Sequence, residues 1–139
     1  MTFVLLLWMA WADISGLKAE PDLGRRSDLA LANGDKSIDE ARKAYGDGDD
    51  TAARAAIEEV AASVELSYDA LAHLPGQPRN NKYYKRAELK VTALIRRLNG
   101  FRLEVSFDSQ QSIDSAIKRL SDVHDDILNA IMSKKKKQQ

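Results

Sequence analysis

The sequence predicts an all-α protein, an antiparallel up-down four-helix bundle preceded by a cleavable signal segment. Apolar residues recur at alternating spacings of three and four from residue 22 onward, which is the helical period. Turn-forming residues divide this pattern into four stretches. A separate, unbroken apolar run occupies residues 3–12. The chain has 139 residues, the length of a single domain, and no stretch shows the period-two alternation of a half-buried strand.

The apolar run at residues 3–12, FVLLLWMAWA, matches the hydrophobic region of a secretory signal peptide. Its ten residues are about half of the roughly 20 that a transmembrane helix needs. Ala10 and Ala12 flank Trp11 in the small-x-small pattern that signal peptidase accepts. We therefore expect cleavage after Ala12 and export to the periplasm or secretion. A buried N-terminal element and an uncleaved anchor are the two alternatives.

These patterns divide the whole chain into four predicted segments. We expect a signal peptide at 1–12, a flexible N-terminus at 13–21, a helical bundle domain at 22–133 and a disordered basic tail at 134–139.

The first two predicted helices are separated by the glycine-rich turn GDGD at 46–49. Gly46 and Gly48 suit the left-handed conformation that ends a helix, and Asp49 or Asp50 suits the N-cap of the next helix. Pro75 begins the loop PGQPRNN that ends the second helix. The first apolar stripe comprises Ala30 or Leu31, Gly34, Ile38, Ala41 and Tyr45. The second comprises Ala53, Ile57, Val60, Val64, Tyr68 and Leu71.

The third and fourth predicted helices carry the most regular patterns. The third stripe comprises Tyr84, Ala87, Val91, Leu94, Leu98, Phe101 and Val105. Asp108 or Ser109 is expected to open the fourth helix, whose stripe comprises Ile113, Ile117, Leu120, His124, Ile127 and Ile131. We expect the centre of the bundle to be formed by Val91, Leu94, Leu98, Ile117, Leu120 and Ile127.

Charge alternates along the chain although the formal net charge is zero. Residues 35–69 carry −6, residues 70–103 carry +7 and residues 104–133 carry −4. A basic third helix between two acidic stretches favours an up-down order in which it lies beside both the second and the fourth helix. A zero net charge gives no global field that favours nucleic acid, so no nucleic-acid partner is expected.

The residues needed for catalysis or for a cofactor are scarce. The absence of cysteine excludes disulfides, thiolate metal sites and a cysteine nucleophile. Asp122 and Asp126 share a helix face, but His124 points elsewhere and no further ligand is indicated. Asp47 begins a stretch with partial calcium-loop spacing, but Ala52 stands where that loop needs glycine. We therefore expect neither an enzyme nor a bound cofactor or metal.

Two functions remain open. The first is a small exported protein that acts by contact with another protein or an anionic envelope surface. Its candidate contact residues are the lysines of the tail, Lys134, Lys135, Lys136 and Lys137. The alternative is a ligand or cofactor carrier with a pocket between helices near Tyr84, Phe101 and His124. A filled core favours the first function, and a large internal cavity favours the second.

Overall fold

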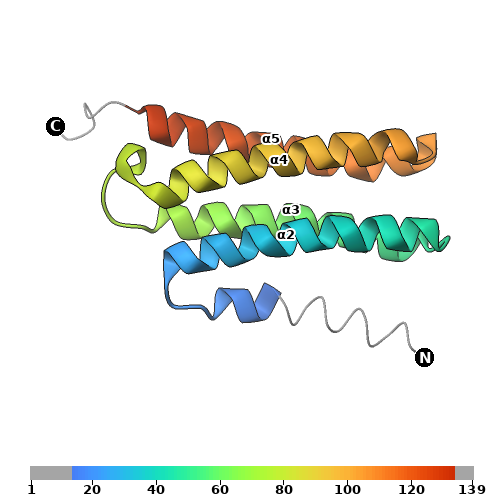
Figure 1. Cartoon of the computed structure of the whole chain (residues 1–139), viewed down its shortest axis with the longest axis horizontal. Helices are drawn as coiled ribbons and strands as arrows, with labels where there is room; N and C mark the ends of the chain where they lie inside the picture. The colour runs from blue at the N-terminus through green and yellow to red at the C-terminus, as the bar shows by residue number, and fades with distance from the viewer. Residues whose placement is uncertain (1–13, 134–139) are drawn as a thin grey trace.

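The computed structural model describes residues 14–133, and within that range the protein is helical throughout and contains no strand. Four long helices, α2 to α5, run roughly along one axis (Figure 1). The elements are α2 (Leu23–Gly46), α3 (Asp50–Ala72), the 3-10 helix η1 (Pro78–Asn80), α4 (Lys82–Glu104) and α5 (Phe107–Met132). The all-helical prediction is confirmed.

Side chains at the helix starts explain where α2 and α3 begin. The carboxylate of Asp22 accepts a hydrogen bond from Arg25 N at 3.1 Å at the start of α2. Asp49 caps α3, as the sequence predicts, by accepting from Ala52 N at 3.0 Å. Such caps satisfy backbone donors that have no partner within the helix. Gly48 takes a positive φ of 80° in the turn before α3, where other residues would be strained.

The start of α5 differs slightly from the prediction. The helix begins at Phe107, one residue before Asp108 and two before Ser109, and its N-cap is Ser106. The backbone N–H of Ser106 donates to the Tyr45 hydroxyl at 2.8 Å. The turn between α4 and α5 is therefore held by Tyr45 at the end of α2. The apolar pattern of α5 alone cannot reveal this contact.

The four helices form two antiparallel hairpins, α2–α3 and α4–α5 (Figure 1). The hairpins pack so that α4 lies beside α2 and α5, while α3 lies beside α2 and α5. Ion pairs from α2 to α4 join residue 28 to 86 and residue 39 to 97, so these neighbours run parallel. The expectation that α4 lies beside α3 is wrong, because those two helices are diagonal. Helix α4 lies instead beside α2 and α5, of which only α5 carries more acidic than basic residues.

The core is continuous and draws on all four long helices. Every residue of the predicted α4 stripe is buried. The stripe of α5 is rotated relative to the prediction, because Ala116 and Val123 are buried whereas Ile117, His124 and Ile131 are only partly buried. Ile117 is therefore at the edge of the core rather than at its centre. Two stripes one position apart both fit the three- and four-residue spacing in this helix. The prediction chose the stripe with the larger apolar side chains, and the structure buries the other.

Helices α2 and α3 meet along a row of buried polar pairs that the apolar pattern did not reveal. Ser27 Oγ lies 2.7 Å from Ser67 Oγ. One layer further along, Asn33 donates to Ser63 Oγ at 2.9 Å. Ser37 then donates to Glu59 Oε2, also at 2.9 Å. Small and polar side chains let these two helices approach closely, and each buried polar group is bonded. The pairs fix the register of the hairpin.

Residues 14–18 form a short helical stretch before α2, which the prediction of a flexible segment at 13–21 missed. Arg26 binds the backbone oxygen of Glu20 through two nitrogens, at 2.9 and 2.7 Å, and so ties this segment to α2. The predicted signal peptide at 1–12 and the lysines at 134–137 lie outside the described residues. Within residues 14–133, no helix combines the length and apolar character needed to cross a membrane.

Candidate functional site: an exposed basic face of α4

The three residues of the predicted carrier pocket lie in different places. Tyr84 is buried near the start of α4, where its hydroxyl donates to the backbone oxygen of Leu71 at 2.9 Å. Phe101 is buried near the other end of α4, roughly 25 Å away at the rise of a helix. Burial raises the pKa of Tyr84, with a smaller contribution from Tyr68, so its hydroxyl stays protonated and can donate. The structure does not bring these residues together around one cavity.

His124 contributes to a contact between α4 and α5 rather than to a pocket. Its Nε2 lies 3.1 Å from Glu88 Oε1 and 3.0 Å from Thr92 Oγ1. The Thr92 hydroxyl donates to the backbone oxygen of Glu88 at 2.9 Å. Both partners share one ring nitrogen, whereas a nucleophile–base–acid triad needs them on opposite nitrogens. The cluster is therefore built to join two helices.

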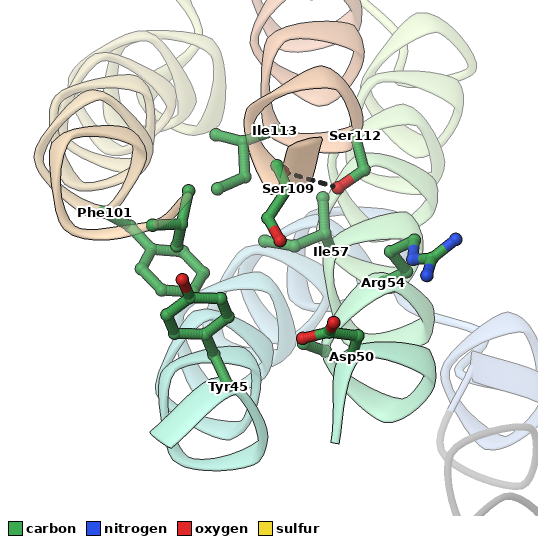
Figure 2. A pocket seen from close by; sticks show the side chains of 10 residues that line it. Tyr45, Asp50, Arg54, Ile57, Phe101, Ser109, Ser112 and Ile113 are labelled. Carbon is green, nitrogen blue, oxygen red and sulfur yellow. Dashed lines mark hydrogen bonds between the residues drawn. The ribbon is translucent and has the colours of Figure 1, made fainter. Parts of the chain in front are cut away.

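The best-formed recess among the described residues lies near the α2–α3 and α4–α5 turns. Figure 2 shows Tyr45 and Phe101 on one side, with Asp50 and Arg54 of α3 and Ser109 of α5 around the opening. The rings of Tyr45 and Phe101 pack edge to face, 6.0 Å apart. The recess has a volume of about 10 Å³, which fits about one water molecule. It is too small for an organic ligand.

The acidic clusters that the sequence raised as metal sites are dispersed in the structure. Asp122 pairs with Lys118 at 3.1 Å on the exposed surface of α5. Asp49 is used as the cap of α3. Within residues 14–133, no group of three His, Asp or Glu side chains is placed to hold a metal ion.

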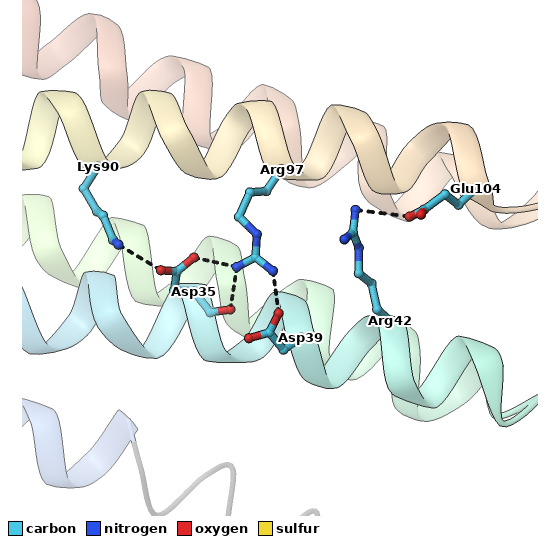
Figure 3. A network of polar contacts seen from close by, with 6 residues as sticks. All are labelled: Asp35, Asp39, Arg42, Lys90, Arg97 and Glu104. Carbon is cyan, nitrogen blue, oxygen red and sulfur yellow. Dashed lines mark hydrogen bonds and ion pairs between the residues drawn. The ribbon is translucent and has the colours of Figure 1, made fainter.

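Helices α2 and α4 are joined by an ion-pair network that uses the cations on one side of α4 (Figure 3). Lys90 donates to Asp35 at 2.8 Å, and Arg97 binds both Asp35 and Asp39. Burial by itself raises the pKa of the Asp35 carboxyl, but the hydrogen bonds from Lys90 and Arg97 outweigh it and lower the pKa overall. Arg42 of α2 completes the network by pairing with Glu104 at 3.1 Å.

The acidic face of α3 meets a single cation of α5. Arg119 binds Glu58 and Glu65 at once. Hydrogen bonds from Glu65 and then from Glu58 raise the pKa of Arg119, so its guanidinium is charged at every accessible pH. Glu58, Glu65 and Asp69 are exposed on α3, which is diagonal to α4.

The side of α4 that faces away from the core carries a different set of residues. We call it the α4 outer face and define it as Lys82, Lys85, Leu89, Ala93, Arg96 and Leu103, all of which are exposed. Leu89 is 70% exposed and Leu103 is 79% exposed. The residues follow one another at helical spacings opposite the buried stripe, so they share one side of the helix.

No carboxylate neutralises the α4 outer face from α4 itself. The two carboxylates of α4 are used elsewhere, Glu88 by His124 and Glu104 by Arg42. Within the described part of the chain, Lys85 and Arg96 make no ion pair, and the partner of Lys82 is the ring of Tyr83, 5.2 Å away. The α4 outer face is thus a basic strip that also exposes two leucines.

Comparisons with protein-family models, curated proteins and solved structures give no match for this chain. The α4 outer face was not among the predicted sites. A signal for it was nevertheless present in the sequence, in the +7 charge of residues 70–103 and in leucines 89 and 103, which lie outside the apolar stripe.

Proposed function

We propose that the chain is an exported four-helix-bundle protein that acts by contact with an anionic envelope surface or another protein, without catalysis. The observation that carries the proposal is the contrast between the filled interior and the α4 outer face. The best-formed recess among residues 14–133 fits about one water molecule, whereas the α4 outer face leaves three cations and two leucines exposed. Exposed apolar residues among unpaired charges are typical of interaction surfaces.

Export is supported by the sequence. The apolar run at 3–12, followed by the small residues Ala10 and Ala12, is typical of a signal peptide. A cleaved chain would begin at Asp13, immediately before the first described residue. The four lysines at 134–137 follow Ser133, the C-cap of α5, and add positive charge to the chain outside the helical domain.

The proposal is tested in the native host by cell fractionation, N-terminal sequencing and crosslinking. We expect the protein in the exported fraction, with Asp13 as its first residue, crosslinked to an envelope component. Intact Met1 on a protein found in the cytosol would contradict export. An exported protein without any crosslinked component would contradict the contact function.

The contribution of the tail is tested separately by co-sedimentation with anionic vesicles. We compare the chain from Asp13 to Gln139 with one that ends at Ser133, at low and at high salt. Each lysine near an anionic surface contributes about 1 kcal/mol, so loss of the tail should weaken binding at low salt. Equal binding of the two chains would assign no role to the tail.

A further inference from the structure

We propose that the α4 outer face docks flat on an anionic lipid bilayer, with Lys82, Lys85 and Arg96 at the headgroups and Leu89 and Leu103 inserted between them. This inference rests on the proposed contact function and names the surface and the ligand that serve it. The occupant we propose is the bilayer surface, rather than an acidic protein or a second copy of the chain.

The chemistry of the α4 outer face fits a bilayer interface. Lysine and arginine reach phosphate headgroups while their aliphatic stems, and neighbouring leucines, contact the acyl boundary. Leu89 and Leu103 are among the most exposed large apolar side chains of the described residues. They are 14 residues apart, or roughly 20 Å along a helix, so they form two separate anchors. A flat interface accommodates anchors at this spacing without any groove.

The shape of the surface argues against a protein helix as the occupant. A docked helix needs a groove in which a central cluster of anchors is fully desolvated. The recess nearest to the end of α4 is lined by Tyr45 and Phe101, which are not part of the α4 outer face. No residue of the α4 outer face lines that recess, and the two exposed leucines are separated by Ala93 and Arg96.

The charge of the face argues against a symmetric dimer. A two-fold interface places the same patch of both copies together. Because the α4 outer face carries three cations and no carboxylate, two copies meeting through it would repel each other. Helix α3, which is diagonal to α4, carries several acidic residues and Arg54 as its one basic residue. Docking through α4 therefore directs the acidic α3 away from an anionic surface.

The ion-pair network between α2 and α4 does not use the cations of the α4 outer face. Lys90 and Arg97 turn toward α2 and are neutralised by Asp35 and Asp39 (Figure 3). These cations are committed to holding the two hairpins together. Lys85 and Arg96 face the other way, and they can bind headgroup phosphates without breaking an ion pair of the described fold.

The test uses the chain from Asp13 to Gln139 and vesicles of equal parts phosphatidylcholine and phosphatidylglycerol, with pure phosphatidylcholine for comparison. The charge variant is Lys85→Glu with Arg96→Glu. Its matched control is Arg54→Glu with Lys118→Glu, which makes the same change in net charge at exposed positions of α3 and α5. The apolar variant is Leu89→Ala with Leu103→Ala, and its control is Met132→Ala, whose side chain is 74% exposed.

We expect the wild-type chain to bind the anionic vesicles at low salt and to bind phosphatidylcholine much more weakly. The charge variant changes four units of charge and should lower the partition coefficient at least about 100-fold. The apolar variant should lower it about tenfold. The Met132→Ala control should bind within about threefold of wild type. The control with Arg54→Glu and Lys118→Glu measures the general effect of net charge on binding, and apart from that effect it should also bind within about threefold of wild type. Circular dichroism should show the same helix content for all variants.

Three results would overturn the inference. If both α4 variants bind like their controls while the chain ending at Ser133 does not bind, the tail alone makes the contact. If wild type does not bind vesicles but the native crosslink is to a protein, the contact function stands and the lipid surface is wrong. If salt-sensitive self-association appears without vesicles and is lost in the charge variant, the face binds a second copy.

Discussion

Gly24 at the start of α2 provides the most direct stability test of how the two hairpins pack. A Cβ atom at this position would lie 2.4 Å from both Cε2 and Cζ of the Tyr83 ring and 2.7 Å from its Cδ2. Carbon atoms in ordinary contact are about 3.5–4.0 Å apart. The substitution Gly24→Ala therefore forces the ring of Tyr83 to retreat by more than about 1 Å or to leave its site on α2.

Two opposing effects determine the size of the change. Overpacking costs about 1–3 kcal/mol, while alanine is favoured over glycine in a helix by up to about 1 kcal/mol. We therefore expect Gly24→Ala to lower the free energy of unfolding by about 0.5–2 kcal/mol. Gly100→Ala is the matched control, because the nearest atom to its new Cβ is Arg42 Nη2 at 3.6 Å, an ordinary contact. It should raise stability by about 0.5–1 kcal/mol.

Urea unfolding followed by circular dichroism measures both changes. Repeating both substitutions in a Tyr83→Ala background separates the clash from other effects. Without the ring, Gly24→Ala should become neutral or stabilising, which is a coupling energy of about 1 kcal/mol or more. If Gly24→Ala is as stable as Gly100→Ala in the presence of Tyr83, the close approach of α4 to α2 is wrong.

Three further predictions concern the core, the buried polar row and the ion-pair network. Leu98→Ala should lower the free energy of unfolding by about 2–5 kcal/mol, whereas the exposed Leu103→Ala should change it by no more than about 0.5 kcal/mol. Equal losses of stability in urea unfolding would contradict the described core. Ser63→Ala removes the partner of buried Asn33 and should cost about 1–3 kcal/mol, a prediction that fails if thermal unfolding is unchanged. The pKa of Asp35 is lowered from its ordinary value of 3.8. Its ionised carboxylate therefore stabilises the folded protein above that pH, and this stabilisation is lost as the pH falls through the lower pKa of the folded state. Asp35→Asn should therefore flatten the loss of stability below about pH 4, and an acid titration as steep as that of wild type would refute the role of this network.

The regular helices could be predicted because local rules determine them. The alternating spacing in α4 identified every one of its buried residues, and the Asp49 cap follows from residues within one turn. The stripe of α5 was harder, since small residues such as Ala116 contribute to the core without a strong apolar signal. Its rotation by one position moved His124 from the predicted core to the contact with Glu88.

The contacts between helices depended on the way the hairpins dock, which local pattern does not encode. Block charge correctly indicated α5 as a neighbour of α4 but wrongly indicated α3. Helix α2 has no net negative charge and pairs with α4 through individual carboxylates such as Asp35. The polar row between α2 and α3 includes Ser37 and Glu59, which a search for apolar periodicity places on a solvated face. The α4 outer face became recognisable once the ion pairs of Lys90 and Arg97 separated the committed cations from the exposed ones.

The orientation of the protein on an anionic bilayer tests the central claim most directly. Because the chain contains no cysteine, a single introduced cysteine carries an environment-sensitive fluorophore without background labelling. Ala93→Cys places the label on the α4 outer face, and Ala55→Cys places it on the exposed surface of α3. On vesicles of equal parts phosphatidylcholine and phosphatidylglycerol, the label at 93 should shift to the blue and be quenched by lipid-attached quenchers, while the label at 55 should behave as it does in water. Equal shifts at both positions, or a shift at 55 alone, would contradict docking through α4.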